Sequence, residues 1–199
     1  MRYGIYLAPA AVVLTLGSLA CKPPKTAEQI KAETQAAFNE GYQAFKDGKA
    51  RATNPYLNDK ENSHKLQGWY DGWDKAAEAE RAAAFKNATD KALVNIHFDY
   101  DKAEIKESDR VILQGIADFM KAYPSIRLEI AGNCDERGTN EYNLALGNKR
   151  AAAALAYLKT LGVDEARFTT ISYGKEKPLC TEAKEACWSQ NRRGEFKLK

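Results

Sequence analysis

A strand, a polar loop and a long helix are expected in succession over residues 126–161, and this order constrains the fold more than any other part of the chain. Residues 126–131 alternate and are rich in β-branched side chains, as in a β-strand. Residues 141–161 are rich in Ala and Leu, with apolar positions at helical spacing. The sequence GNCDERGT, residues 132–139, lies between them, so Asp135 is expected in a strand-to-helix loop.

Asp135 and Arg150 have the chemistry of a clamp for a ligand that carries both charges. An ionised Asp only accepts hydrogen bonds, as an ammonium requires, and Arg can hold a carboxylate through two parallel hydrogen bonds. Arg150 is on the expected helix, where a long side chain can reach back toward the loop. Spacing alone leaves a second interpretation, in which the two residues bridge each other or cap the helix, since surface ion pairs are common and worth about 0–1 kcal/mol.

Further elements are expected on both sides of this segment. Strands are predicted at residues 93–98, 168–173 and 195–198, and a helix at 108–123 that ends before Pro124. The resulting β-α-β-α-β-β order predicts an α+β domain of two layers, residues 88–199, with helices packed on one face of a mixed sheet.

Six motifs occur in a fixed order in this part of the chain. They are FDYD at residues 98–101, GNCDERGT at 132–139, EYN at 141–143, LGNKRA at 146–151, SYGKEKP at 172–178 and NRR at 191–193. Together they resemble the OmpA-like peptidoglycan-binding domain family, and within it the peptidoglycan-associated lipoproteins of Gram-negative outer membranes. The resemblance implies the same two-layer fold.

The resemblance also implies a ligand and the residues that hold it. In the family, the positions of Asp135 and Arg150 hold the free end of meso-diaminopimelate in the peptidoglycan stem peptide, and Asp99, Thr139 and Asn143 fall on motif positions around the same pocket. Uncrosslinked diaminopimelate ends in an amino-acid head, so Asp135 would take its ammonium and Arg150 its carboxylate.

The chain departs from the family pattern just before this aspartate. Many members have a His and a small residue where this chain has Asn133 and Cys134. Asn can still form hydrogen bonds, but a His-dependent effect of pH on binding is not expected.

The resemblance implies a non-catalytic anchor between the outer membrane and the cell wall. It further implies partnership with the Tol proteins, a TolB-like propeller that competes with peptidoglycan for the same face and a TolA-like component. A soluble periplasmic protein, an inner-membrane-anchored protein and a cell-wall-acting enzyme remain as alternatives. The enzyme has little motif support, because His64 and His97 lie in different modules and neither has a nucleophile signature beside it.

The N-terminus predicts export. An apolar run fills most of residues 1–20 and reads as a signal peptide with a small-residue cleavage site. Cys21 resembles the acylated cysteine of a bacterial lipoprotein, which would make residues 21–25 a lipidated linker on the periplasmic face of the outer membrane. Ser18 stands where the lipobox prefers a branched apolar residue, so cleavage by the ordinary secretory peptidase is the alternative.

The remaining cysteines fit an oxidising compartment. Cys180 and Cys187 would close a short polar loop between two strands, and a disulfide there is the preferred interpretation. Cys134 is then a buried small hydrophobe. A pairing that involves Cys134, and a zinc site that joins the three cysteines to His97, are the alternatives, although the zinc site has no C-x₂-C pairing.

Residues 26–87 are expected to form a helical hairpin module. Thr26 and Gln29 make a possible capping box, and a first helix is expected to stop near Gly48. Trp69 and Trp73 lie on the apolar stripe of a second helix that continues through residues 76–87 as a connector.

The helical module has a resemblance of its own. Its sequence carries GYQA at residues 41–44, Gly48, Pro55-Tyr56, Trp69 and Gly72-Trp73. Over roughly residues 38–77 this pattern is similar to the ribosome modulation factor family, whose ribosome-binding role would require the cytoplasm and a basic surface. The segment is nearly neutral and follows an export signal, so it is interpreted as a reused small helical fold. Its tryptophans are expected in the core, the alternative being a surface for a partner or a sugar.

Composition is ordinary for a globular protein, at 44% hydrophobic and 29% charged residues. The formal net charge of +3 falls by one without the signal peptide, so nucleic acid is not an expected partner. No cofactor is expected. Asp99 and Asp101 alone are too few oxygen ligands to predict a metal site, and strand-end hydrogen bonding is the simpler role for them.

Overall fold

The computed structural model describes residues 24–199. The predicted signal peptide and Cys21 therefore lie outside the described residues. The chain divides into two compact units, Met1–Ala77 and Glu78–Lys199, and the division falls within one helix, whereas the sequence places it near residue 88. Within residues 24–199, every helix is too short or too polar to cross a bilayer.

The first unit is built on two helices. Helix α1 (Ala27–Lys46) begins at the expected capping box, in which Thr26 and Gln29 each accept a hydrogen bond from the other's backbone N–H. Two short 3₁₀ turns, Arg51–Thr53 and Lys60–Asn62, lead to helix α2 (Ser63–Ala92). Helix α2 is continuous through the predicted connector.

Aromatic side chains fill the space between the two helices of this unit. Trp69 is 2% exposed and packs with Ala37 and Ala44, as the apolar stripe predicts. Trp73 is partly buried against the same cluster, and its indole Nε1 donates to the Lys49 carbonyl at 2.9 Å. Both tryptophans therefore serve the packing of the module.

Close approach of the helices depends on glycine. A Cβ at Gly72 would lie 1.9 Å from the carbonyl oxygen of Phe38 on helix α1, a backbone atom that cannot move aside alone. Gly72 therefore fixes how near α2 lies to α1.

The second unit contains a sheet of four strands, β1 (Ile96–His97), β2 (Leu128–Asn133), β3 (Phe168–Gly174) and β4 (Arg193–Leu198). Their order in the sheet is β1-β4-β2-β3. Strand β2 pairs in parallel with β3 and antiparallel with β4, which in turn pairs antiparallel with β1. The predicted mixed sheet is confirmed.

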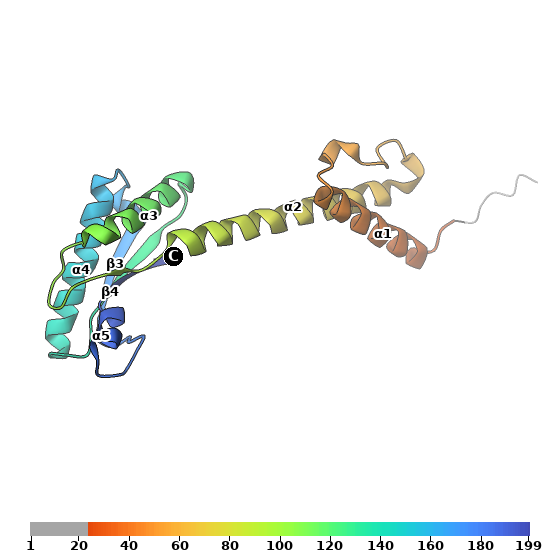
Figure 1. The fold of residues 1–199 in the computed structure, drawn as a ribbon. Coiled ribbons are helices and arrows are strands. Elements are labelled where there is room, and N and C mark those ends of the chain that lie inside the picture. The colour runs from red at the N-terminus through yellow and green to blue at the C-terminus, as the bar shows by residue number, and fades with distance from the viewer. Residues whose placement is uncertain (1–23) are drawn as a thin grey trace, which may run out of the picture. The chain divides into compact units, whose positions relative to one another are not determined.

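Helices α3 (Arg110–Ala122) and α4 (Asn140–Thr160) pack against the sheet and complete the second layer (Figure 1). The core between the layers is apolar and closed. It includes Phe98, Leu113, Ile116, Met120, Leu128, Ile130, Leu158, Phe168 and Phe196. The predicted α+β class is confirmed, with one addition: a short helix α5 (Glu185–Asn191) lies between β3 and β4, where the sequence predicts only a polar loop.

A pair of glycines brings helix α4 onto strand β2. A Cβ at Gly132 would lie 1.9 Å from the carbonyl oxygen of Gly147. A Cβ at Gly147 would in turn lie 2.1 Å from the Ser172 hydroxyl. This contact sets the distance between the end of β2 and the helix that carries Arg150.

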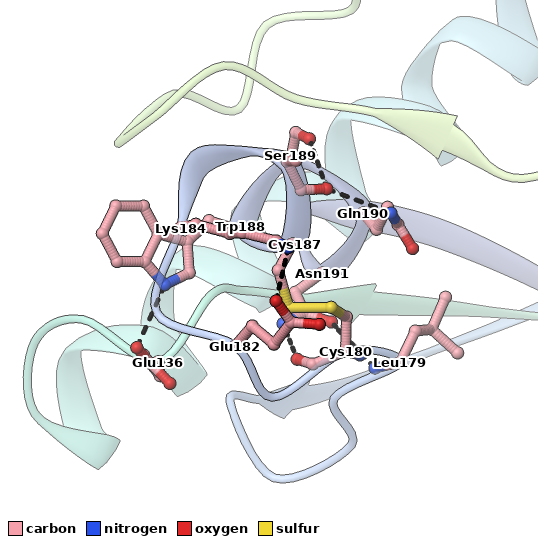
Figure 2. The surroundings of a disulfide bond; sticks show 11 residues. Glu136, Leu179, Cys180, Glu182, Lys184, Cys187, Trp188, Ser189, Gln190 and Asn191 are labelled. Atoms are coloured by element: carbon pink, nitrogen blue, oxygen red, sulfur yellow. Dashed lines mark hydrogen bonds and ion pairs between the residues drawn. A yellow bond between two sulfur atoms is a disulfide. The ribbon is translucent and has the colours of Figure 1, made fainter.

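A disulfide joins Cys180 to Cys187 and fixes the first turn of α5 to the loop before it (Figure 2). The Asn191 side chain completes the loop, because it accepts from the Leu179 and Cys180 backbone N–H groups and donates to the Cys180 carbonyl. Cys134 is buried and unpaired with another cysteine.

We expect Gly132→Ala to lower the free energy of unfolding of this domain by at least about 2 kcal/mol, since its Cβ would overlap backbone. The matched control is Gly115→Ala on α3, where an added Cβ meets nothing within 4 Å. Helix propensity predicts a gain of about 0.5–1 kcal/mol there. Denaturant unfolding followed by circular dichroism distinguishes the two, and equal effects would contradict the role of the glycine contact.

Reduction of the Cys180–Cys187 disulfide is expected to lower the free energy of unfolding by about 2–3 kcal/mol, because the unfolded chain regains the entropy of a short loop. Denaturant unfolding with and without a phosphine reductant measures the loss. A Cys180→Ala/Cys187→Ala variant is the control, and any further loss in that variant would show that the reductant acts elsewhere.

Candidate ligand-binding site

A pocket of about 460 Å³ opens where the loop after β2 meets the first turns of α4. Its walls come from four segments of the second unit. The lining residues are Tyr100, Asp101, Cys134, Asp135, Arg137, Gly138, Thr139, Tyr142, Asn143, Leu146, Arg150 and Arg192. Four of the five residues predicted from the sequence therefore line one pocket.

Asp135 is 3% exposed, and two arginines surround its carboxylate. Oδ1 accepts from the backbone N–H and from Nε of Arg137, both at 3.2 Å. Oδ2 accepts from Nη2 of Arg137 at 2.6 Å and from Nη1 of Arg192 at 3.1 Å. A buried carboxylate is stable here because each oxygen accepts two charge-assisted or backbone hydrogen bonds.

The pKa of Asp135 lies below its ordinary value. Burial alone would raise that pKa, but the hydrogen bonds from Arg137 and Arg192 favour the charged form more strongly. Asp135 is therefore an anion throughout the physiological range.

Arg150 is fully buried, and its guanidinium is held by main-chain oxygens. Nε donates to the Lys102 carbonyl at 2.8 Å, Nη1 to the Asn133 carbonyl at 2.8 Å and Nη2 to the Asp99 carbonyl at 3.0 Å. Nη1 also contacts the Cys134 sulfur at 3.3 Å. Burial lowers the pKa of Arg150, which still remains a cation at neutral pH.

Asp135 and Arg150 thus line the same pocket through different sets of partners. Within residues 24–199, the hydrogen bonds of Asp135 come from Arg137 and Arg192, and those of Arg150 go to carbonyls and to Cys134. Within the described residues, Asp135 and Arg150 therefore do not form an ion pair with each other.

Thr139 and Asn143 shape the rim of the pocket. Thr139 is the N-cap of α4, and its hydroxyl accepts from the Tyr142 backbone N–H at 3.2 Å. Asn143 donates to the Arg137 carbonyl at 2.8 Å and to the Thr139 carbonyl at 3.1 Å. Both side chains hold the loop that carries Asp135.

Asp99 takes part in the site through its backbone. Its carbonyl accepts from Arg150, while its side chain lines a neighbouring hollow, 3.8 Å from the ammonium of Lys106. The Asp99 side chain therefore does not line the main pocket, although Arg192 lines both hollows.

Sequence reasoning missed the residues that hold Asp135. The guanidinium of Arg137 lies 3.9 Å from the ring centre of Tyr100 and 4.1 Å from that of Trp188. Arg192 bonds Asp135, Glu185 and the Phe98 carbonyl. Both arginines belong to sequence motifs, Arg137 to GNCDERGT and Arg192 to NRR. The presence of an aspartate and two arginines in these motifs was the sequence signal that could have indicated the partners of Asp135.

No group of three or more His, Cys, Asp or Glu side chains that could hold a metal ion occurs within residues 24–199. The described part of the chain thus contains neither the zinc site considered for the cysteines and His97 nor a site built on Asp99 and Asp101.

The fold and the pocket define an α+β domain in which a strand-to-helix loop presents a buried acid beside a buried arginine. The OmpA family model matches residues 97–192. The peptidoglycan-associated lipoprotein of Burkholderia pseudomallei, solved by crystallography, is 43% identical with a TM-score of 0.52, over 53% of this chain and 89% of that one. The C-terminal domain of this chain belongs to the OmpA family.

Two curated relatives carry the same name. The peptidoglycan-associated lipoprotein of Agrobacterium fabrum is 48% identical over 98 residues, which are 49% of this chain and 55% of the relative. That of Rhizobium meliloti is 49% identical over 98 residues, 56% of its length. The chain thus matches a little over half the length of these relatives. A second family model, ribosome modulation factor, matches residues 26–82.

We expect Asp135→Asn to lower the free energy of unfolding by about 3 kcal/mol at pH 7, because it removes the buried anion that pairs with both Arg137 and Arg192 and leaves Arg192 only the exposed Glu185 carboxylate. The folded-state pKa of Asp135 is depressed, so its contribution is complete above the unfolded value, about 3.9, and is lost as pH falls through the folded value. Denaturant unfolding of both proteins between pH 7 and pH 2.5 measures this difference. A difference that does not shrink in acid would contradict the assignment.

Proposed function

We propose that this chain is a non-catalytic lipoprotein that binds peptidoglycan and anchors the outer membrane to the cell wall. The observation that carries the proposal is a pocket whose floor contains a buried acid, Asp135, and a buried arginine, Arg150. Membership of the C-terminal domain in the OmpA family supports it, as do relatives named for their association with peptidoglycan.

The ligand proposed for this pocket is the free end of meso-diaminopimelate in the stem peptide. Asp135 takes the ammonium and Arg150 the carboxylate, while Thr139 and Asn143 keep the rim in place. Arg150 has five N–H donors, and four are engaged by the protein, so one N–H of Nη2 remains for the ligand. Arg192, which also lines the pocket, adds a second positive charge beside that carboxylate.

The role proposed for Asp99 is indirect. Its carbonyl positions the Arg150 guanidinium, and its exposed carboxylate pairs with Lys106 outside the main pocket. We retain Asp99 as part of the site on that basis.

The N-terminal parts give the proposal its location. A signal peptide over residues 1–20 and acylation of Cys21 would place the protein on the periplasmic face of the outer membrane. The helical module, which the ribosome modulation factor model matches over residues 26–82, is proposed as a folded spacer between lipid and wall, because its tryptophans are used in packing. The disulfide between Cys180 and Cys187 fits that oxidising compartment.

A Tol partnership is proposed from the family resemblance. A TolB-like propeller would compete with peptidoglycan for the loop face around Asp135, and a TolA-like protein would connect to the inner membrane.

Calorimetric titration of the protein with a stem peptide that bears free meso-diaminopimelate tests the ligand. We expect binding, and at least tenfold weaker binding of the lysine-containing peptide, which lacks the second carboxylate. Arg150→Lys and Asp135→Asn should each weaken binding by tenfold or more, since a partly desolvated charged contact is worth about 2–4 kcal/mol.

The control for this titration is Arg110→Gln, because Arg110 is exposed on α3 and its ion pair within residues 24–199 is with the nearby Glu107. This variant should bind the stem peptide with the affinity of the wild-type protein. Equal binding of both peptides, or full binding by the Asp135→Asn variant, would contradict the proposed clamp.

A further inference from the structure

The carboxylate of Asp135 has no acceptor position left for a ligand. A carboxylate offers about four lone-pair sites, and here the backbone N–H, Nε and Nη2 of Arg137 and the Nη1 of Arg192 use all four. An ammonium that binds Asp135 must therefore replace one of these donors.

The two arginines differ in how readily they could leave. The side chain of Arg192 is 7% exposed and is tied also to the Phe98 carbonyl at 3.1 Å and to Glu185. The side chain of Arg137 is 31% exposed. Within residues 24–199 its ion-pair partners are Asp135 at 2.6 Å and, more distantly, Glu185 at 4.0 Å. Arg137 is therefore the donor that a ligand can displace.

Aromatic rings hold Arg137 in that position. Its guanidinium is stacked between Tyr100 and Trp188 at 3.9 and 4.1 Å from the ring centres, a geometry of two cation–π contacts. Trp188 is fixed in turn, because its Nε1 donates to Glu136 at 3.0 Å and its neighbour Cys187 is in the disulfide (Figure 2). These contacts favour the position in which Arg137 is bonded to Asp135.

We propose that Arg137 occupies the ammonium position of the site as an internal substitute for the ligand, and that a ligand amine binds Asp135 by displacing the Arg137 side chain from the Tyr100–Trp188 stack. This inference rests on the proposed function, since it takes Asp135 as the group that binds the ammonium. The exchange leaves the charge beside Asp135 unchanged, because one cation replaces another.

The exchange makes Arg137 a specificity-determining residue. A ligand whose amine is acetylated cannot compete with a guanidinium for a buried carboxylate, because an amide N–H forms a weaker bond to a carboxylate than a charged donor does. The site therefore rejects a modified amine more strongly than an open pocket would, at the cost of lower affinity for the correct one.

The test is the affinity of Arg137→Gln for the same stem peptide, measured by calorimetry on the whole protein. Removal of the competitor should raise affinity at least about tenfold, because the ligand no longer has to break the Nε and Nη2 hydrogen bonds from Arg137 to Asp135. Lys106→Gln is the control, because it removes a nearby exposed cation that bonds Asp99 and not Asp135. It should change affinity by less than twofold.

Trp188→Leu provides a second variant, which leaves the Arg137–Asp135 bonds available but removes one face of the stack. Affinity should rise about threefold, in line with one cation–π contact at a partly exposed site.

Tryptophan fluorescence gives an independent signature of the exchange. Ligand binding should change the emission of the wild-type protein, because Trp188 loses its contact with the Arg137 cation. It should not change the emission of Arg137→Gln or Trp188→Leu.

The outcomes separate this inference from the function it rests on. If the unchanged protein binds the peptide and Asp135→Asn does not, but Arg137→Gln binds with equal or lower affinity, then Arg137 supports the ligand and the displacement model is wrong. If neither the unchanged protein nor Arg137→Gln binds the peptide, the proposed function itself fails.

Discussion

The buried guanidinium of Arg150 is the interaction on which the site depends. It joins carbonyls from two segments far apart in the chain, Asp99 and Lys102 in one and Asn133 in the other, while its own helix lies against β2 through Gly132 and Gly147. A cation with this many buried hydrogen bonds is costly to leave unsatisfied, so the loop, the strand end and the helix must take their places together. The pocket therefore forms when these segments of the domain fold together.

The buried Asp135 carboxylate belongs to the same group of charges. Besides burial, the nearby Arg192 lowers the pKa of Arg150, and Asp135 raises it. Arg137 adds a third cation at the rim, where the Tyr100 and Trp188 rings hold it. The burial of the arginines therefore decreases from Arg150, which is fixed at the floor of the pocket, to Arg137, which a ligand can displace at its mouth.

The sequence predicted the elements better than it predicted the contacts. Periodicity and β-branched content located β2, β3 and α4 to within a few residues, because the two strands contain apolar and β-branched residues and the helix is rich in Ala and Leu. Helix α5 was missed, since its seven residues depend on the disulfide and on Asn191 more than on an apolar stripe. The family resemblance placed Asp135, Thr139, Asn143 and Arg150 at one pocket, and also Asp99, whose side chain lies outside it. The partners of these residues were not predicted, because Arg137, Arg192 and three backbone carbonyls converge only in the folded domain.

The proposed exchange at Asp135 explains why so much positive charge surrounds a site meant for an amine. Desolvation of a carboxylate is expensive, and an empty buried anion would raise its own pKa and lose its charge before any ligand arrived. Arg137 and Arg192 meet that cost during folding and keep Asp135 ionised. A ligand ammonium then has only to replace one cation by another beside a carboxylate that is already buried and charged. The affinity depends on how much more strongly the ligand ammonium binds Asp135 than Arg137 does. The Tyr100–Trp188 stack stabilises Arg137 in its place and therefore helps to set the strength of ligand binding.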